Sequence, residues 1–304
     1  MTCHLYIVTQ TKELVETISM TYTKNKMIDL HIHSMISDGS DSVEKIIELA
    51  ISNNCKAIAL SDHDTVQGCE QAKNYGEKLG LEVITACEIN AQWENKSVHI
   101  LGYFFQPIQN GLLEYLKTIQ ATRHERNLMT LEKLQEIGIK IDFDQLYEQA
   151  KGAIIGKPHI AAILMQQNKV SSIQQAFDLY LARGKIAYID RNSPDVSQVI
   201  EVINQSGGVA VFAHPLRSNI EKSELEQILI KMSHLGLGGV ECYYSSYSQS
   251  LREELTEITS RTGLVPTGGS DYHGSYKPKL QIGIGYGDLE VPNIVLDRLK
   301  QICL

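Results

Sequence analysis

Two histidines at the end of a short apolar segment are spaced for metal binding. Residues 29–34 read Asp-Leu-His-Ile-His-Ser, so a single residue separates His31 from His33. Alternate side chains of a β-strand project from the same face, which places these two imidazoles about 6.5–7 Å apart. That distance allows both rings to bind one metal ion. An H-x-H pattern alone, however, is a weak signal.

Other imidazoles and carboxylates recur at or near the ends of apolar runs. They are Asp38, His63, Glu88, His99, His214, Asp271 and His273. Imidazoles and carboxylates without thiolates suit zinc, manganese or iron in a multinuclear, carboxylate-bridged site. Taken singly, His99 is more simply a core histidine, and the acids beside His63 are more simply helix caps. Taken together, about nine unpaired polar groups among core residues would be costly, which favours the metal site.

Seven apolar, β-rich runs are predicted to be the strands that carry these residues. They cover residues 28–33, 57–61, 82–88, 97–104, 208–213, 238–243 and 265–270. Several are apolar on both faces, as in a parallel sheet covered by helices. With amphipathic helices between them, the runs predict an α/β barrel or a doubly wound sheet. In a parallel barrel the carboxyl ends of the strands meet at one mouth, so six of the seven would deliver side chains to one place.

The helical patterns predict helix starts and one insertion. Asp41 with Glu44 is typical of a capping box, and Pro194 after Ser193 is typical of a helix start. Between the fourth and fifth runs, residues 106–192 show helical faces and no convincing strand pair. We expect a helical insertion that covers one end of the barrel as a lid.

Three segments are therefore predicted along the chain. The barrel comprises residues 27–105 and 193–304, and the helical insertion comprises residues 106–192. Residues 1–26 fit neither part and are an N-terminal extension of uncertain structure.

The composition is typical of a globular cytoplasmic protein. Of 304 residues, 43% are apolar and 21% charged, and no apolar run approaches the roughly 18 residues of a membrane span. Six cysteines without a C-x-x-C pair indicate reduced thiols. A net charge of −8 argues against duplex DNA as a partner but is compatible with a local phosphate pocket. The oligomeric state stays open.

The ordered motifs of the chain resemble those of a known family. They are DLHIHS (29–34), SDG (37–39), LSDHDT (60–65), CEI (87–89), VHILGY (98–103), GKPHIA (156–161), AHP (213–215), GVECY (239–243) and GSDYHG (269–274). They resemble the PHP (polymerase and histidinol phosphatase) superfamily, and within it the nucleoside 3′,5′-bisphosphate phosphatase branch that includes the RNase AM exoribonucleases. The resemblance covers residues 27–287 and implies a distorted seven-stranded barrel of PHP type with an inserted helical domain.

The resemblance also implies the metal ligands and the cofactor. The implied ligands, through which the catalysis would run, are His31, His33, Asp38, His63, Glu88, His99, His214, Asp271 and His273. Glu88 is the expected bridging carboxylate, while Asp62 and Asp64 are expected to orient ligands or cap helices. Up to three divalent ions are expected, manganese first, with zinc or iron as alternatives that share the same ligands.

Basic residues of the predicted insertion are candidates for substrate binding. Lys157 and His159 lie in the GKPHIA motif, and Arg123 and Arg126 lie on a predicted helix. Lys157 stands where the family usually has arginine, and lysine lacks the two-pronged grip of arginine on phosphate. Tyrosines 243, 244 and 247 would either stack on a nucleobase or fill the barrel rim.

The expected function is that of a metal-dependent phosphoesterase. Its substrates would be nucleoside 3′,5′-bisphosphates, such as adenosine 3′,5′-bisphosphate, losing their 3′-phosphate, and short RNA trimmed from its 5′ end. The attacking group would be a hydroxide between two metals, since metal binding lowers the pKa of water to about 7. The alternatives are histidinol-phosphate phosphatase or another small phosphomonoesterase, and a non-catalytic metal-binding module of the same fold. The long insertion argues against the first, and the full set of ligand types against the second.

Overall fold

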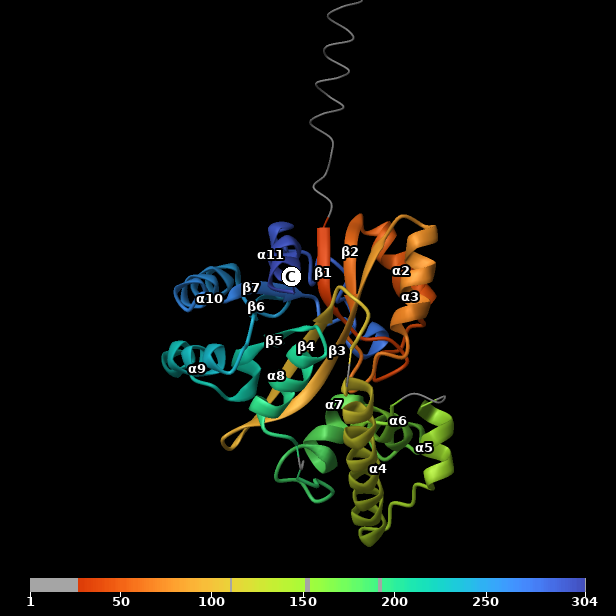
Figure 1. Cartoon of the computed structure of the whole chain (residues 1–304). Helices are drawn as coiled ribbons and strands as arrows, with labels where there is room; N and C mark the ends of the chain where they lie inside the picture. The colour runs from red at the N-terminus through yellow and green to blue at the C-terminus, as the bar shows by residue number, and fades with distance from the viewer. Residues whose placement is uncertain (1–26, 110, 151–153, 191–192, 304) are drawn as a thin grey trace, which may run out of the picture.

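A seven-stranded barrel carries helices on its outside and a separate group of helices at one end (Figure 1). The computed structural model describes residues 27–109, 111–150, 154–190 and 193–303. The predicted extension, residues 1–26, lies outside the described residues. Among the helices described, none combines the length and the apolar character needed to cross a membrane.

The strands follow one another around the barrel in sequence order. They are β1 (Met27–Ile32), β2 (Cys55–Leu60), β3 (Glu82–Trp93), β4 (Lys96–Phe104), β5 (Val209–Phe212), β6 (Gly239–Tyr244) and β7 (Val265–Gly269). The last strand meets the first, because the backbone amide of Asp271 donates to the carbonyl of His31 at 2.8 Å. The predicted distorted seven-stranded barrel is confirmed.

Gly269 allows β7 to approach β1 closely. A Cβ atom at this position would lie 2.4 Å from both the backbone nitrogen and the Cβ of His31. Only glycine fits such a contact. The first candidate ligand of the chain is thereby held against the last strand.

The strand β4 runs opposite to the expected direction. It pairs antiparallel with β3 and with β5, whereas the other strand pairs are parallel. The third strand does not end at Glu88 but continues to Trp93 and returns through a tight hairpin, which requires antiparallel pairing. The sequence pattern missed this because strands covered on both faces look alike in either direction. His99 accordingly reaches the site from the first half of its strand.

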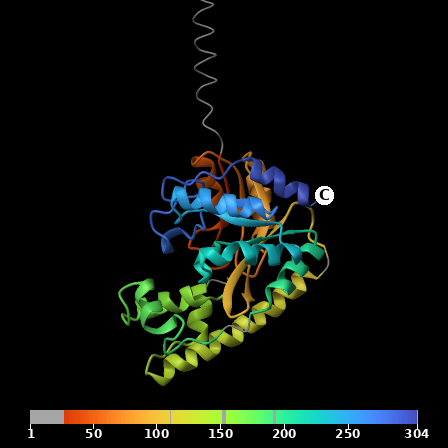
Figure 2. The same ribbon diagram turned by 90° about the vertical axis from the view of Figure 1, so that its left-hand side faces the viewer.

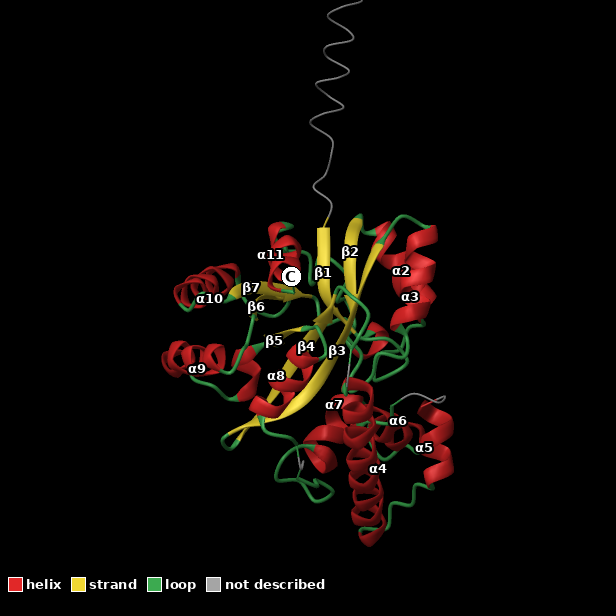
Figure 3. Cartoon of the chain, in the orientation of Figure 1, coloured by secondary structure: helices red, strands yellow, loops and turns green. Residues whose placement is uncertain are grey.

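Helices cover the outer surface of the barrel (Figure 3). They are α2 (Val43–Ser52), α3 (Cys69–Lys78), α8 (Val196–Gln205), α9 (Lys222–His234), α10 (Gln249–Arg261) and α11 (Ile294–Ile302), with short turns η2 (Pro215–Ser218) and η3 (Gly274–Tyr276). Two helix starts differ from the predictions. Ser42, not Asp41, caps α2, because the Asp41 carboxylate accepts a hydrogen bond from Tyr272. Asp195 caps α8, so the helix begins after Pro194 rather than at it.

A helical group lies between β4 and α8 in the chain. It comprises α4 (Leu112–Glu136), α5 (Phe143–Ala150), α6 (Lys157–Gln166), α7 (Ile173–Ala176) and η1 (Phe177–Leu181). The group has an apolar core of its own, which includes Leu134, Leu146 and Leu164. In Figure 2 the long α4 runs along one side of the barrel.

The helical group touches the barrel at the loops that follow β1 and β2. Gln120 of α4 donates to the carbonyl of Asp64 at 2.7 Å. The backbone amide of Ile154 donates to the carbonyl of Ile36 at 2.8 Å. These loops carry candidate ligands, so the helical group adjoins the site. Its domain status and its movement as a lid stay predictions.

Candidate metal centre

The structure brings the nine candidate ligands together in one cluster. They come from β1 and the loop after it, from the loop after β2, from β3 and β4, and from the loops after β5 and β7. Eight of them are buried, with His31 and His33 fully inaccessible to solvent, and only the side chain of His99 is partly exposed, at 22%. The carboxylates and imidazoles therefore face one another in a space that excludes bulk water.

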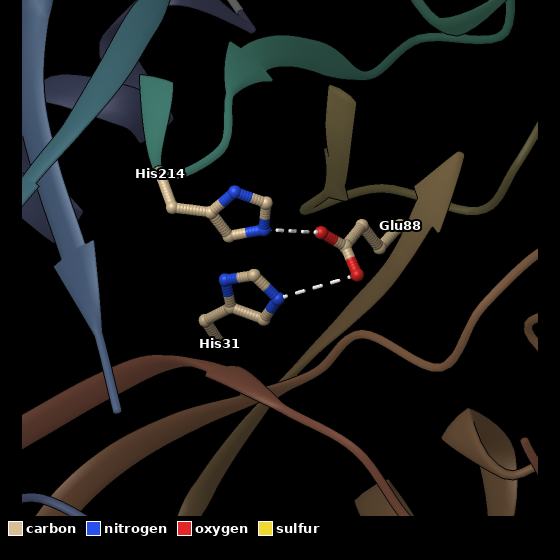
Figure 4. Close-up of side chains that lie close together, drawn as sticks. All are labelled: His31, Glu88 and His214. Atoms are coloured by element: carbon tan, nitrogen blue, oxygen red, sulfur yellow. Dashed lines mark hydrogen bonds and ion pairs between the residues drawn. The ribbon is translucent and has the colours of Figure 1, made fainter. Parts of the chain in front are cut away.

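Glu88 has more histidine neighbours than the other two carboxylates of the cluster, and Figure 4 shows it facing His31 and His214. Its Oε1 accepts hydrogen bonds from His99 Nδ1 at 2.8 Å and from His214 Nε2 at 3.0 Å. Its Oε2 lies 3.2 Å from the Nε2 atoms of His33 and His63 and 3.5 Å from that of His31. One carboxylate with both oxygens surrounded by imidazoles has the geometry expected of a bridging ligand.

Two further carboxylates complete the cluster. Asp271 Oδ1 lies 3.4 Å from His33 Nε2 and 3.4 Å from His273 Nδ1. Asp38 lies 3.5 Å from His273 through Oδ1 and 3.7 Å from His63 through Oδ2. Each histidine thus faces at least one carboxylate, which is the charge balance that shared divalent ions would require.

The donor set fits divalent metal ions. Four overlapping groups have ligand atoms within 4.8 Å of one another, namely His31-Glu88-His214, His31-His33-Asp271, His33-His63-Glu88 and His33-Asp38-His273. Among the described residues, the buried Nδ1 atoms of His33, His63 and His214 have no hydrogen-bond partner. Buried nitrogens rarely stay unpartnered. Oxygen and imidazole ligands at this density are those of a multinuclear metal centre.

The cluster shifts the pKa values of its own residues in opposite directions. Burial alone would lower the pKa of His33, but hydrogen bonds to Asp271 and Glu88 and the nearby negative charges raise it to about 9. Burial would raise the pKa of Asp38, but the charges of His63 and His273 hold it well below its usual range. The pKa of His31 is raised as well, by the charges of Glu241, Glu88 and Asp271, whereas burial lowers the pKa of His63 and lowers that of His273 to about 4. Without metal, the cluster therefore pairs the positive imidazoles of His31 and His33 with negative carboxylates.

Metal binding should release protons from this network. With a pKa of about 9, His33 is protonated at pH 7 in the metal-free protein and must lose its proton to bind a cation. We expect at least one proton released per protein molecule when the cluster is loaded at pH 7. Apparent affinity should rise about tenfold per pH unit up to about pH 9 and then level off. Calorimetric titration with Mn²⁺ in buffers of different ionisation enthalpy counts these protons. A heat that does not depend on the buffer at pH 7 would contradict the expectation.

Glu241 is a functional residue that the sequence reasoning missed. It is fully buried, its Oε1 accepts from His31 Nδ1 at 3.0 Å, and its Oε2 accepts from the backbone amide of His214 at 2.8 Å. This pairing directs His31 Nε2 towards Glu88. The GVECY motif contained the signal, but an acid inside an apolar strand did not by itself indicate which residue it would orient.

Asp62 lies where it can orient the loop of a candidate ligand, as expected, but it does not cap the helix that follows it. Its oxygens accept from the Ser34 amide at 2.8 Å, the Ser34 hydroxyl at 2.6 Å and the Ser37 hydroxyl at 2.6 Å. These bonds shape the loop that carries Asp38. The following helix, α3, is preceded by Gly68 instead, and Asp64 forms an ion pair with Arg123.

Three residues at the site have left-handed backbone conformations. The φ angles are 55° at Asp64, 28° at His214 and 57° at Asp271. Residues other than glycine reach positive φ at a cost of order 1–3 kcal/mol, a strain that concentrates at functional sites. Each of the three lies just beyond a strand, where the turn of the backbone presents the side chain to the cluster or its edge.

A pocket of about 520 Å³ adjoins the cluster. Its lining includes Asp64, Asn90, Arg123, Arg126, Ser193 and Gln198. Asp64 follows the candidate ligand His63, and Asn90 pairs across the sheet with His99. The volume lies within the usual range for small-molecule sites, about 300–1,000 Å³. Both predicted arginines therefore line a cavity beside the candidate metal centre.

The two residues of the GKPHIA motif have different surroundings. Lys157 Nζ donates to the carbonyl of Leu181 at 2.8 Å and lies 4.1 Å from the ring centre of Tyr188. The ammonium thus points into the helical group, which runs against the expectation that it grips a phosphate. His159 is buried, and its Nδ1 accepts from the amide of Gly156 at 3.0 Å. Burial lowers the pKa of His159. The positive charge of Arg123 lowers this pKa further, while the negative charge of Asp38 opposes the shift.

The rim tyrosines fill the barrel rather than offering a face for a nucleobase. Tyr244 and Tyr247 are buried at 2% and 6% exposure. The Tyr244 hydroxyl donates to Asp271 at 2.7 Å, and the Tyr247 hydroxyl accepts from the amide of Leu216 at 3.1 Å. Of the two interpretations left open by the sequence, the structure favours packing at these positions.

Together with the family match and the relatives described next, the seven-stranded α/β barrel and its cluster define a metal-dependent hydrolase of phosphoric esters. Residues 29–255 match the PHP domain family, and the chain belongs to that family.

Three relatives resemble it over most of its length. A 5′-3′ exoribonuclease of Haemophilus influenzae is 32% identical, with 82% of this chain and 90% of the relative covered. A phosphoribosyl 1,2-cyclic phosphate 1,2-diphosphodiesterase of Eggerthella lenta is 31% identical, covering 82% and 94%. A 3′,5′-nucleoside bisphosphate phosphatase of Chromobacterium violaceum is 29% identical, covering 81% and 87%.

A solved structure supports the assignment at the level of the fold. The crystal structure of a metal-dependent phosphoesterase from Bifidobacterium adolescentis superposes with a TM-score of 0.81 at 28% identity, covering 91% of this chain and 96% of that one. The barrel and the helical group are therefore shared nearly end to end.

Proposed function

We propose that this protein cleaves the bond between phosphorus and O3′ in 5′-phosphorylated nucleotides. It removes the 3′-phosphate of nucleoside 3′,5′-bisphosphates and shortens RNA from its 5′ end. The observation that carries the proposal is the pocket lined by Arg123 and Arg126 beside the buried cluster. A substrate whose scissile phosphate lies at the cluster can place its nucleoside and 5′-phosphate in that pocket.

The chain's own residues have distinct tasks in this reaction. Bound divalent ions supply an activated water and neutralise the charge of the phosphoryl group. Glu88 and the surrounding histidines hold those ions in place. Arg126 binds the 5′-phosphate through charge-assisted hydrogen bonds. Arg123, tied to Asp64 and to the carbonyl of Ile155 at 3.1 Å, fixes α4 beside the cluster. Manganese is the proposed metal. Zinc and iron share the same imidazole and carboxylate ligands, so the choice between the three metals is left to the screen below.

One reaction accounts for both substrates. Water attacks phosphorus, the P–O3′ bond breaks, and O3′ takes a proton. In the bisphosphate the product is inorganic phosphate, and in RNA the phosphate stays on the shortened chain. The substrates named for the two kinds of relative would thus differ only in the group attached to the scissile phosphate, which is absent in a bisphosphate and is the rest of the chain in RNA.

A product screen tests the function. Chromatography measures inorganic phosphate from the phosphomonoesters, the released 5′-mononucleotide from the RNA, and ring opening of the cyclic phosphate. The metal-free protein is loaded with Mn²⁺, Zn²⁺ or Fe²⁺ and offered adenosine 3′,5′-bisphosphate, 5′-phosphorylated RNA, phosphoribosyl 1,2-cyclic phosphate and histidinol phosphate. We expect the bisphosphate and the RNA to be the best substrates, with Mn²⁺ the best metal. A preference for histidinol phosphate would support the small-phosphomonoesterase alternative. One or no bound ion together with no turnover would support a non-catalytic module.

Substituting Arg126 should weaken recognition of the 5′-phosphate selectively. For Arg126→Gln we expect kcat/KM for the bisphosphate to fall at least tenfold, because a hydrogen bond to a charged group contributes about 1.5–3 kcal/mol. The value for a nucleoside 3′-monophosphate, which lacks the 5′-phosphate, should change little. The exposed Arg183 of the same helical group provides the matched control, Arg183→Gln. Equal losses on both substrates would remove Arg126 from the 5′-phosphate site.

A further inference from the structure

Two cationic side chains flank the cluster at Asp271, and neither lines the pocket. Arg217 lies in η2, just after His214, and Lys277 lies just after η3. Their side chains are 54% and 26% exposed. Neither was identified from the sequence, and the bound ions together with Arg126 leave them without a task in the proposed reaction. We call this pair the cationic rim.

The cationic rim touches the outer oxygen of Asp271. While Oδ1 faces the histidines, Oδ2 accepts from Lys277 Nζ at 2.5 Å and from the Tyr244 hydroxyl at 2.7 Å. Arg217 Nη1 donates to that hydroxyl at 2.6 Å and lies 3.7 Å from Oδ2. Asp271 thus separates the candidate ions on one side from two fixed positive charges on the other.

The cationic rim and the pocket lined by Arg123 and Arg126 are formed by different parts of the chain. The pocket is lined by residues between Asp64 and Gln198, from the loop after β2, from β3, from α4 and from the start of α8. The rim comes from the loops after β5 and β7. Because Asp271 contacts both the cluster and the rim, a ligand that continues from the pocket past the cluster would meet the rim with the part beyond its scissile phosphate.

We propose that Arg217 and Lys277 form a subsite for the next phosphodiester of an RNA substrate, downstream of the scissile bond. This rests on the proposed function and specifies it. Divalent ions held by the cluster would share the negative charge of Asp271, so the two cations would be left with excess positive charge beside it. A single-stranded polyanion places its following phosphate there, whereas a bisphosphate ends at the cluster and cannot reach.

The order of bond changes agrees with this placement. Cleavage of the P–O3′ bond releases the first nucleotide into the pocket and leaves the new 5′-phosphate on the remaining chain. That chain then lies on the rim side. The rim would hold it there between successive cleavages.

The test compares binding of two ligands that cannot be hydrolysed. One is a 5′-phosphorylated tetranucleotide with a methylene phosphonate at its first linkage, and the other is the corresponding mononucleotide 3′-phosphonate 5′-phosphate. Both are titrated into the metal-loaded enzyme. For Arg217→Gln and Lys277→Gln we expect the preference for the tetranucleotide over the mononucleotide to fall about tenfold. The slope of log Kd against log salt should fall by about 0.7 per removed contact for the tetranucleotide only.

The comparison cancels effects that act through Asp271. If the substitutions merely displaced the Asp271 carboxylate, binding of both ligands would weaken by the same factor. The ratio of tetranucleotide to mononucleotide affinity would then stay unchanged, and that result would overturn the proposal. Arg217→Lys keeps the charge and should restore most of the preference. Arg261→Gln, at a side chain of the same 54% exposure paired with Glu226 on α9, is the matched control and should leave the ratio unchanged. A parent enzyme that binds the tetranucleotide but hydrolyses no bisphosphate would refute the proposed function and leave the rim intact.

Discussion

Replacing Glu88 by glutamine is expected to lower kcat/KM by roughly a thousandfold, about 4 kcal/mol of transition-state stabilisation. Both oxygens of this carboxylate face imidazoles, from 2.8 Å at His99 to 3.5 Å at His31. Glutamine keeps the shape but removes the charge and replaces one oxygen with an amide group that cannot bind a cation. The ions that Glu88 is proposed to bridge would then lose the ligand they share.

Metal content separates this effect from misfolding. We expect Glu88→Gln to retain fewer ions per chain than the parent by elemental analysis, with an unchanged circular dichroism spectrum and no rescue by excess Mn²⁺. Glu82→Gln, on the same strand but exposed and paired with Lys300, provides the matched control and should behave like the parent. Parental activity with a full metal complement would show that Glu88 is not a bridging ligand.

Local spacing identified only the first pair of candidate ligands, and the others were identified from their recurrence near the ends of apolar runs and from the family motifs. His31 and His33 project from one strand face by simple alternation, and the chemistry of nine imidazoles and carboxylates has few other uses. The sequence pattern could not show in which direction β4 runs relative to its neighbours. The strand that carries His99 is covered on both faces, so its residues look the same whether it runs parallel or antiparallel.

Residues that act through others were harder to find. Glu241 is surrounded in sequence by apolar residues, and only the fold shows that it contacts both His214 and His31, which lies 210 positions away. Lys157 shows the opposite case. Its motif indicated a phosphate contact, whereas tertiary packing turns its ammonium towards Leu181. Long-range partners of flexible side chains are set by packing, which local sequence patterns do not contain.

Glu241→Gln should lower metal affinity by up to a hundredfold, the upper part of the range for residues that orient metal ligands. The carboxylate accepts from His31 Nδ1 through one oxygen and from the His214 amide through the other. A carboxamide presents one oxygen and one NH2 group, so one of these two buried donors would face another donor. That mismatch costs about 1–3 kcal/mol and tilts one of the two imidazoles away from Glu88.

Unlike the change at Glu88, this loss should be recovered by excess metal. Glu241 contacts ligands and not the ions, so kcat at saturating Mn²⁺ should return to within a few-fold of the parent, while half-maximal activation shifts to higher Mn²⁺ concentration. Direct Mn²⁺ titration, monitored by calorimetry without substrate, provides a readout that does not depend on turnover. Activation at the parental concentration would show that the Glu241 carboxylate does not set the orientation of His31, and a kcat that stays low at saturation would place it in the reaction itself.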